Sequence, residues 1–170
     1  MVTPRDWADP FLAQATDDLR AAQALYLARV PSTFCMLVQM TFEKLAKAAL
    51  ARKHVLPPKS HEVASRLLLL LERAPGGSAL PATSRALVFG AVRELENAQP
   101  AVVASAMKGQ GVPQYPQLEY PWENPATGAV EWPGRHLPIA KRMTDPRDPV
   151  GPQLLKLAKA LEAQFDTLFP

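Results

Sequence analysis

Cysteine, glycine and long apolar runs are all scarce in this sequence. Its 170 residues include 1 Cys and 8 Gly. One thiol cannot form an internal disulfide, so Cys35 argues against a small secreted protein held together by disulfide bonds and fits a reducing cytoplasm. The longest leucine run, residues 67–71, is far shorter than the roughly 18 apolar residues of a membrane-spanning helix. The first ten residues contain no apolar signal region. We therefore expect a cytoplasmic protein with no membrane segment.

Several motifs of known chemistry are also absent. The sequence has no Walker-type glycine loop, no dinucleotide-binding fingerprint and no nucleophile elbow. Its 3 histidines and 1 cysteine include no close pair of the kind that binds structural zinc, so we expect neither a metal nor a cofactor. The net charge of +3 and the pI of about 9.2 are compatible with a nucleotide or nucleic-acid partner, but they do not require one.

What the sequence does contain is a series of helical apolar patterns. Apolar residues recur every three or four positions over residues 9–29, 33–53, 61–74, 81–97 and 152–170, and a shorter pattern follows at 101–108. The second segment has the widest apolar arc, because Met36, Met40 and Phe42 extend its stripe. We therefore predict that this helix is central and is contacted on several sides. Cys35 lies in the same run and is predicted to be a small buried hydrophobic residue.

Polar residues at the helix ends and surfaces complete this prediction. Asp9 is a good N-cap for the first helix, and Ser60 is a good N-cap for the third. Pro31 is expected to separate the first two helices. Glu43 and Lys47 stand four residues apart, and we expect them to pair on an exposed face of the second helix.

Residues 109–152 have a different composition. They hold nine of the 18 prolines, two of the three Trp and two of the three Tyr. No helical period persists there, but a short hairpin is expected with Thr127 and Gly128 near its turn. The sequence therefore predicts an all-α protein. We expect an antiparallel, up-and-down bundle of four or five helices in a single domain, residues 1–170, with a long Pro- and aromatic-rich insertion at 109–152 before the last helix.

Part of the sequence resembles a known family. The stretches ATDDLRAAQAL and FCMLVQMTFEKLAKAALARKHVLPPKSHEVASRLLLLLE are similar to the first helices and the connecting loop of the HEPN family, which are small helical bundles. QYP at 114–116 is similar to the RYP element that many members carry after the fourth helix, with Gln in place of Arg. The specific resemblance covers residues 15–73, and the remainder matches in helix order. The shared positions are Gln39, Glu43, Lys44, Lys47, Pro57, Pro58, Ser60, His61 and Glu62.

The resemblance implies a bundle that often forms a homodimer and associates with a nucleotidyltransferase-type protein, as in toxin–antitoxin and defence pairs. In many members it also implies metal-independent RNA cleavage, which depends on an Arg and a His separated by four to six residues near the fourth helix. In this chain no Arg stands at that distance before His54, His61 or His136, and the segment 81–97 contains arginines but no His. The resemblance therefore carries over no catalytic residue.

The loop between the second and third predicted helices is the first candidate site. A helix N-terminus beside several cations is a natural binding site for phosphate or another anion. The alternative, which we favour, is that these polar residues only cap helix ends and face water, since cap chemistry explains Ser60 without a ligand. The residues concerned are Arg52, Lys53, His54, Lys59, Ser60 and His61.

The insertion provides the second candidate site. Its aromatic rings, next to a basic patch, are able to stack on the bases of single-stranded RNA. The alternative, which we favour, is that the rings hold the insertion against the bundle or dock a second subunit. The residues concerned are Tyr115, Tyr120, Trp122, Trp132, Arg135 and His136.

These features lead us to expect a non-catalytic, HEPN-like binding or interaction module. The expected partners are a second copy of the chain, a nucleotidyltransferase-type protein, and nucleotide or RNA as a ligand. Two alternatives remain. One is a divergent metal-independent ribonuclease in which His61 or His136 works with an Arg that is distant in sequence. The other is a purely structural, oligomeric helical protein.

Overall fold

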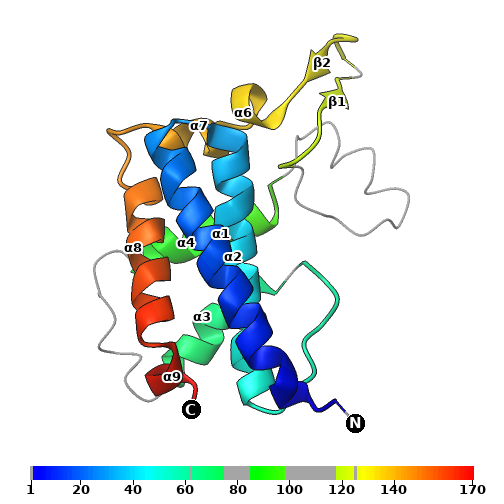
Figure 1. Ribbon diagram of the computed structural model, residues 1–170. Coiled ribbons are helices and arrows are strands. Elements are labelled where there is room, and N and C mark those ends of the chain that lie inside the picture. Colours follow the sequence, from blue (N-terminus) through cyan, green and yellow to red (C-terminus); the bar gives the residue numbers. More distant parts are fainter. Residues whose placement is uncertain (1, 62, 75–84, 99–117, 125) are drawn as a thin grey trace.

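A computed structural model of the chain describes residues 2–61, 63–74, 85–98, 118–124 and 126–170. A short 3-10 helix, η1 (Pro4–Trp7), leads into two long antiparallel helices, α1 (Ala8–Leu27) and α2 (Pro31–Arg52), which pack along their whole length (Figure 1). The other elements are α3 (Ala64–Glu72), α4 (Arg85–Glu96), β1 (Trp122–Glu123), β2 (Val130–Glu131), α6 (Pro133–His136), α7 (Pro138–Thr144), α8 (Val150–Ala163) and α9 (Phe165–Leu168). The prediction of an all-α helical bundle is confirmed.

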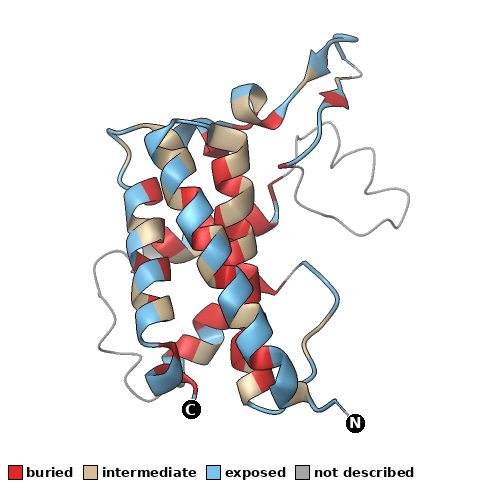
Figure 2. Ribbon diagram, viewed as in Figure 1, coloured by how far each residue is buried: buried red, intermediate tan, exposed pale blue. Residues whose placement is uncertain are grey.

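The helix α2 is the centre of the bundle, as its wide apolar arc predicted. It contacts η1, α1, α3, α4, α6, α7 and α8. Phe34 and Phe42 have no exposed surface, and Leu45 is 1% exposed. Figure 2 shows the contrast between α2, which carries buried residues along its length, and α1, which turns one exposed face to solvent. Because other elements cover α2 on several sides, this helix has no fully solvent-exposed face. Its charged residues are therefore largely surrounded by protein.

The observed helix ends differ from the expected ones. Pro31 is the first residue of α2, with Val30 at the N-cap, because a proline has no N–H and loses nothing in the first turn. The helix α1 begins at Ala8, so Asp9 lies inside its first turn and does not cap it. The helix α3 begins at Ala64 with Val63 at the N-cap, and the predicted capping role of Ser60 is wrong.

Within the insertion, the predicted hairpin is confirmed. The strands β1 and β2 are antiparallel, with Trp122 opposite Glu131 and Glu123 opposite Val130. Gly128 closes the turn with a φ of +67°, a conformation that glycine adopts without strain, and its N–H donates to the Asn124 carbonyl at 2.8 Å. Figure 1 shows the hairpin projecting beyond the end of the helical body.

The rest of the insertion contains two helices that were not expected. No sustained helical period was found in residues 109–152, yet the short helices α6 and α7 lie within this segment. Pro133 and Pro138 occupy the first turns of these helices. In α7, Ile139, Ala140 and Met143 are buried against the bundle. The helix-like segment 101–108, residues 81–84 of the predicted fourth helix and the QYP element at 114–116 lie outside the described residues.

The last predicted helix is confirmed, with a break near its end. The helix α8 ends at Ala163, and α9 follows after Gln164, whose φ of −110° departs from helical geometry. Leu154, Leu161 and Phe165 complete the core from this side, each 2% exposed or less. None of the described helices combines the length and the apolar character needed to cross a bilayer.

Candidate functional site

A row of polar side chains is buried on the central helix α2. Gln39, Glu43, Lys44 and Lys47 are 5%, 4%, 7% and 7% exposed. Their spacing of four, one and three residues places them on one side of the helix. The expectation that Glu43 and Lys47 form a pair on an exposed face is therefore wrong. The spacing of the pair was correct, but the packing around α2 removes it from solvent.

Glu43 is the centre of this row. Its Oε1 accepts a hydrogen bond from Lys47 Nζ at 2.7 Å, and its Oε2 accepts one from Gln39 Nε2 at 3.2 Å. His61, from the loop before α3, places its Nδ1 3.1 Å from the same Oε2. Gln39 Nε2 also lies 3.3 Å from the His61 carbonyl oxygen, to which it donates. An ionised carboxylate only accepts hydrogen bonds, so the proton in the contact between Glu43 and His61 belongs to Nδ1.

The buried charges are balanced. Lys44 forms an ion pair with Asp18 of α1, and the side chains of the two residues are 8% and 15% exposed. Glu43 and Lys47 form the second pair, with side chains 6% and 9% exposed. Lys47 also lies over the ring of Phe11, with its Nζ 5.8 Å from the ring centre. Because isolated charges are costly inside a protein, each ammonium group depends on its own carboxylate for stability.

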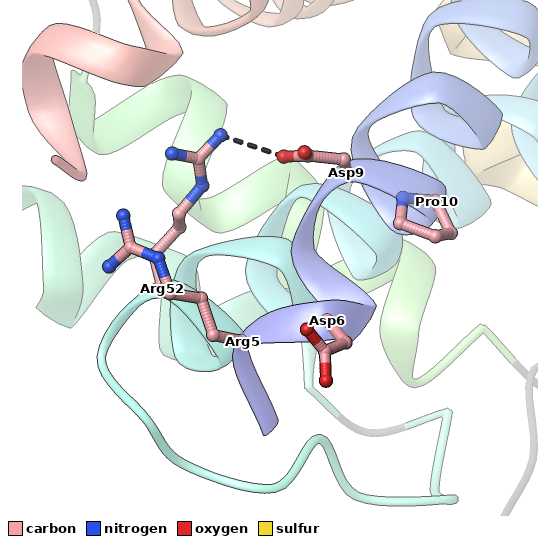
Figure 3. Close-up of a pocket in the computed structure, with 5 residues that line it drawn as sticks. All are labelled: Arg5, Asp6, Asp9, Pro10 and Arg52. Carbon is pink, nitrogen blue, oxygen red and sulfur yellow. Dashed lines mark hydrogen bonds and ion pairs between the residues drawn. The ribbon is translucent and has the colours of Figure 1, made fainter. Parts of the chain in front are cut away.

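Arg52, at the end of α2, binds carboxylates of its own chain. Its Nη2 donates to Asp9 Oδ1 at 2.8 Å and to Asp166 Oδ1 at 2.9 Å. This contact borders a cleft of about 460 Å³ lined by Arg5, Asp6, Asp9, Pro10 and Arg52. Figure 3 shows the Asp9 carboxylate directed at the Arg52 guanidinium and the Asp6 side chain pointing away from it. Two carboxylates thus already neutralise the first cation of the predicted anion site.

The other residues of the predicted anion site fall into two groups. Lys53 and His54 follow the last turn of α2, and both are exposed. His61 instead contacts Glu43, ten residues before Lys53, which corresponds to a separation of about 15 Å along the helix axis. Lys59 and Ser60 are exposed and lie within two residues of His61. The loop between α2 and α3 therefore runs back along α2. As a result, Lys59, Ser60 and His61 are separated from the cations at the C-terminal end of that helix.

The N-terminus of α3 already holds a carboxylate. Ser65 donates its backbone N–H to Glu96 Oε1 at 3.4 Å, and Glu96 is 5% exposed. The positive end of the α3 dipole stabilises this buried negative charge, and the charge in turn repels a second anion. An anion bound near His61 would therefore depend on side chains, chiefly Lys59, and not on the helix end.

The second predicted site is divided between the core and the surface. Trp122 is 8% exposed and belongs to the hydrophobic core, and its Nε1 donates to Glu131 Oε2 at 3.1 Å. Trp132 is 43% exposed, and Tyr120 is 66% exposed. Tyr115 lies outside the described residues. Trp122 thus fastens the hairpin to the bundle, which agrees with the structural interpretation of this ring.

Arg135 and His136 both contact Trp132. The Arg135 guanidinium carbon lies 5.4 Å from the centre of the indole ring, and the His136 ring meets the indole edge to face at 4.9 Å between centroids. The backbone N–H and the backbone carbonyl oxygen of Trp132 both lie within hydrogen-bond distance of His136 Nδ1, at 3.0 and 3.1 Å. These three residues form a cluster at α6, in which Trp132 and Arg135 are exposed and His136 is half-buried.

Cys35 is buried, as predicted from its apolar surroundings. Burial, with a smaller contribution from the charge of Glu94, raises the pKa of its thiol to about 12. Its Sγ lies 3.6 Å from Met143 Sδ. A thiol held in the protonated form and packed against a thioether is an unreactive core residue.

The sequence pattern could not reveal the contacts that assemble the buried row. Asp18 reaches Lys44 across 26 residues, and His61 reaches Glu43 across 18. A helical period indicates which side chains share a face, but it does not indicate what covers that face. The available signal was the apolar arc of α2, since a helix that is central must bury its charged residues as well.

Comparison with known proteins identifies the fold family. The family model described as HEPN domain matches residues 8–98, from the first residue of α1 to just beyond α4. This segment is more than half of the chain and includes the buried row and His61. No curated protein and no solved structure gives a significant match. The chain belongs to the HEPN domain family.

Proposed function

We propose that this chain is a non-catalytic HEPN module that binds the phosphate of a nucleotide, either free or within RNA, beside Lys59 and His61. The observation that carries the proposal is the buried row of α2. Its polar residues are engaged with one another in a charge-balanced network, and His61 is the member of that network with an exposed side chain, at 55%. The network positions the His61 side chain at the surface, whereas the charged groups of the buried row are inaccessible to a substrate.

The surroundings of His61 argue against RNA cleavage there. The carboxylate that binds His61 is neutralised by Lys47, not by an arginine. The sequence also has no Arg at the family's catalytic spacing before any histidine. Cleavage without a metal needs a group that stabilises the charge developing on the phosphate, and such groups supply a large part of the rate acceleration. The family's pairing of Arg with His is therefore missing where the family model matches.

Charge and exposure support a ligand at this surface. Lys59 is exposed, and it forms no ion pair with a described residue. Lys53 is similarly exposed, but it lies at the C-terminus of α2, where the helix dipole disfavours an anion. Lys59 is therefore the stronger phosphate ligand of the two.

The test combines a binding assay with a cleavage assay on the purified protein. A thermal-shift titration with ATP and with a short single-stranded RNA should give a saturable rise in melting temperature, because both ligands bind the folded state. Lys59→Ala should weaken that rise, whereas Lys156→Ala, an exposed lysine on α8, should not. The RNA should stay intact. Cleavage that is lost on changing a residue of this chain, or no shift with either ligand, would refute the proposal.

The proposal extends to assembly. We expect a homodimer that pairs in the cytoplasm with a nucleotidyltransferase-type protein in a toxin–antitoxin or defence system, since family membership supports this context. Light scattering during size-exclusion chromatography gives the oligomeric state, and co-expression with a candidate nucleotidyltransferase tests the pairing. A monomer at micromolar concentration that elutes apart from the nucleotidyltransferase would contradict this part of the proposal.

The cluster at α6 favours a second candidate function, a divergent ribonuclease. Arg135 and His136 lie on the same indole ring, so an arginine and a histidine are close in space without the family's sequence spacing. Cleavage of RNA that disappears in both Arg135→Ala and His136→Ala, but persists in His61→Ala, would select this function over binding.

A further inference from the structure

We propose that the cleft beside Arg52 binds an α-amino acid with a basic side chain. The cleft lies where η1 leads into α1 and where α2 ends, and it has a volume of about 460 Å³. Charged side chains dominate its lining, which consists of Arg5, Asp6, Asp9, Pro10 and Arg52. This inference is independent of the phosphate site proposed above, because neither Lys59 nor His61 is among the described residues that line the cleft.

The cleft offers hydrogen-bond donors that the carboxylates around it do not use. Arg5 is exposed and forms no ion pair with a described residue. Arg52 binds both of its aspartates through Nη2, and within the described part of the chain its Nη1 makes no hydrogen bond and its buried Nε has no partner. Figure 3 shows the two guanidinium groups on the same side of the cleft. Unused N–H donors on two guanidinium groups are suited to the two oxygens of a carboxylate.

The other charged residues of the lining provide acceptors for ammonium groups. Asp9 gives Oδ1 to Arg52, but its side chain is 83% exposed, so Oδ2 stays accessible. Thr3 donates twice to Oδ2 of Asp6, from its backbone N–H at 2.7 Å and from its hydroxyl at 2.9 Å, and this leaves Oδ1 as an acceptor. The same bonds lower the pKa of Asp6, so this carboxyl group is ionised at neutral pH.

The balance of charge determines which ligand fits. The lining holds two arginines and two aspartates, and Asp166, which also binds Arg52, adds one more negative charge. A phosphate or another simple anion would therefore meet three carboxylates and two guanidinium groups, and the like charges would oppose its binding. Lysine carries the complementary set, since it has two ammonium groups for the carboxylates and one carboxylate for the guanidinium groups.

The size and polarity of the cleft agree with such a ligand. Its volume lies within the range of about 300–1,000 Å³ that is usual for small-molecule sites. Most of those sites are largely apolar, whereas Pro10 is the one apolar residue in the described lining here. A ligand of this cleft is therefore held by charge, and its affinity should fall as the salt concentration rises.

NMR titration of the nitrogen-15-labelled protein with L-lysine tests the site. Two analogues each lack one charged group: cadaverine has no carboxylate, and L-norleucine has no side-chain ammonium group. Lysine should cause saturable shifts in the backbone signals of residues 5–9 and 52. Each analogue should bind about 3- to 10-fold more weakly, because one hydrogen bond between charged groups is lost and water partly screens it. Inorganic phosphate should cause no saturable shift of these signals.

Matched variants assign the contacts. Arg5→Ala should make lysine bind as weakly as cadaverine, whereas Arg20→Ala, which removes an exposed arginine elsewhere on α1, should change nothing. Asp9→Asn should weaken the binding of lysine. Asp166→Asn should have a smaller effect, because Asp166 also binds Arg52 but does not belong to the described lining. This pair of variants separates contact with the ligand from an effect transmitted through Arg52.

Four results would overturn the inference. The first is the absence of a saturable shift with lysine, and the second is an analogue that binds as tightly as lysine. The third is phosphate binding that saturates the same signals, which would make the cleft a simple anion site. The fourth is an equal loss of affinity in Asp166→Asn and Asp9→Asn. None of these results bears on the phosphate site beside Lys59, which the nucleotide titration tests separately.

Discussion

Replacing Glu43 with Ala tests whether the buried row of α2 stabilises the fold as a unit. The substitution removes a carboxylate that accepts bonds from Lys47, Gln39 and His61. Lys47 then keeps its charge with a side chain only 9% exposed and without its carboxylate. The nearby ring of Phe11, 5.8 Å from the ammonium nitrogen, offsets a small part of that loss.

The expected cost is large for one residue. Breaking a buried ion pair by deleting one partner destabilises a protein by about 3–5 kcal/mol, because the remaining charge is left in a poorly solvated position. A domain of this kind has a total stability of about 5–15 kcal/mol, so Glu43→Ala should remove about a fifth of it or more. The double variant Glu43→Leu, Lys47→Met should recover much of the loss, since no buried charge remains.

Equilibrium urea denaturation measures the effect as a fall in the transition midpoint at unchanged slope. The control is Arg20→Ala, which removes an exposed pair with Asp17 at 3.8 Å and should change stability by no more than about 0.5 kcal/mol. If Glu43→Ala does not fold, the milder Glu43→Gln takes its place. A loss below about 1 kcal/mol with Glu43→Ala would mean that solvent screens the pair, and the reasoning about this row would be wrong.

Three further predictions concern other parts of the molecule. Gly151→Ala should destabilise the protein by at least about 1–3 kcal/mol in the same urea assay, because the new Cβ would lie 2.0 Å from the Met143 carbonyl oxygen. The control is Gly90→Ala, whose new Cβ would lie in open space within α4. This variant should stabilise the protein by about 0.5–1 kcal/mol. Cys35 should not react with a thiol reagent at pH 8 until urea unfolds the chain, since its pKa is raised to about 12, and rapid labelling of the folded protein would contradict its burial. Hydrogen bonds from Thr3 at the start of η1 lower the pKa of Asp6, so its contribution to stability is present above the unfolded value near 3.8 and is lost as the pH falls through the lower folded value. In thermal melts, Asp6→Asn should be destabilising at pH 7, and the difference from the unaltered protein should shrink as the pH falls below 3.8.

The sequence predicted the bundle because its main signal was local. The apolar stripe of α2 and the extra width given by Phe42 are properties of consecutive residues, and they correctly indicated a central helix. The two short helices near the end of the insertion were missed for an equally local reason. No helical period persists over such short segments, although Pro133 and Pro138 lie in the first turns of the two helices, where a proline is favourable. The position of each proline at a helix start was the signal available.

The candidate site was harder to predict, because its contacts join distant positions. The six residues of the candidate anion site are close in sequence. Because the loop runs back along α2, however, His61 lies about 15 Å from Lys53 along the helix axis. Arg52 was one of the candidate anion ligands, but two aspartates from other helices already bind it. Charge patterns in the sequence identify residues that need an oppositely charged partner. The packing of the helices determines which partner each residue contacts.

The bonds of Arg52 also bear on how the chain folds. They join residues that are 43 and 114 positions apart, and the second of these loops includes most of the protein. Closing a long loop costs entropy that nearby contacts must first offset, so the bond to Asp166 forms once α9 has reached the end of α2. We therefore expect this contact to be absent from the folding transition state. Its removal should therefore accelerate unfolding and leave the folding rate almost unchanged, which makes this guanidinium a determinant of how long the folded state persists.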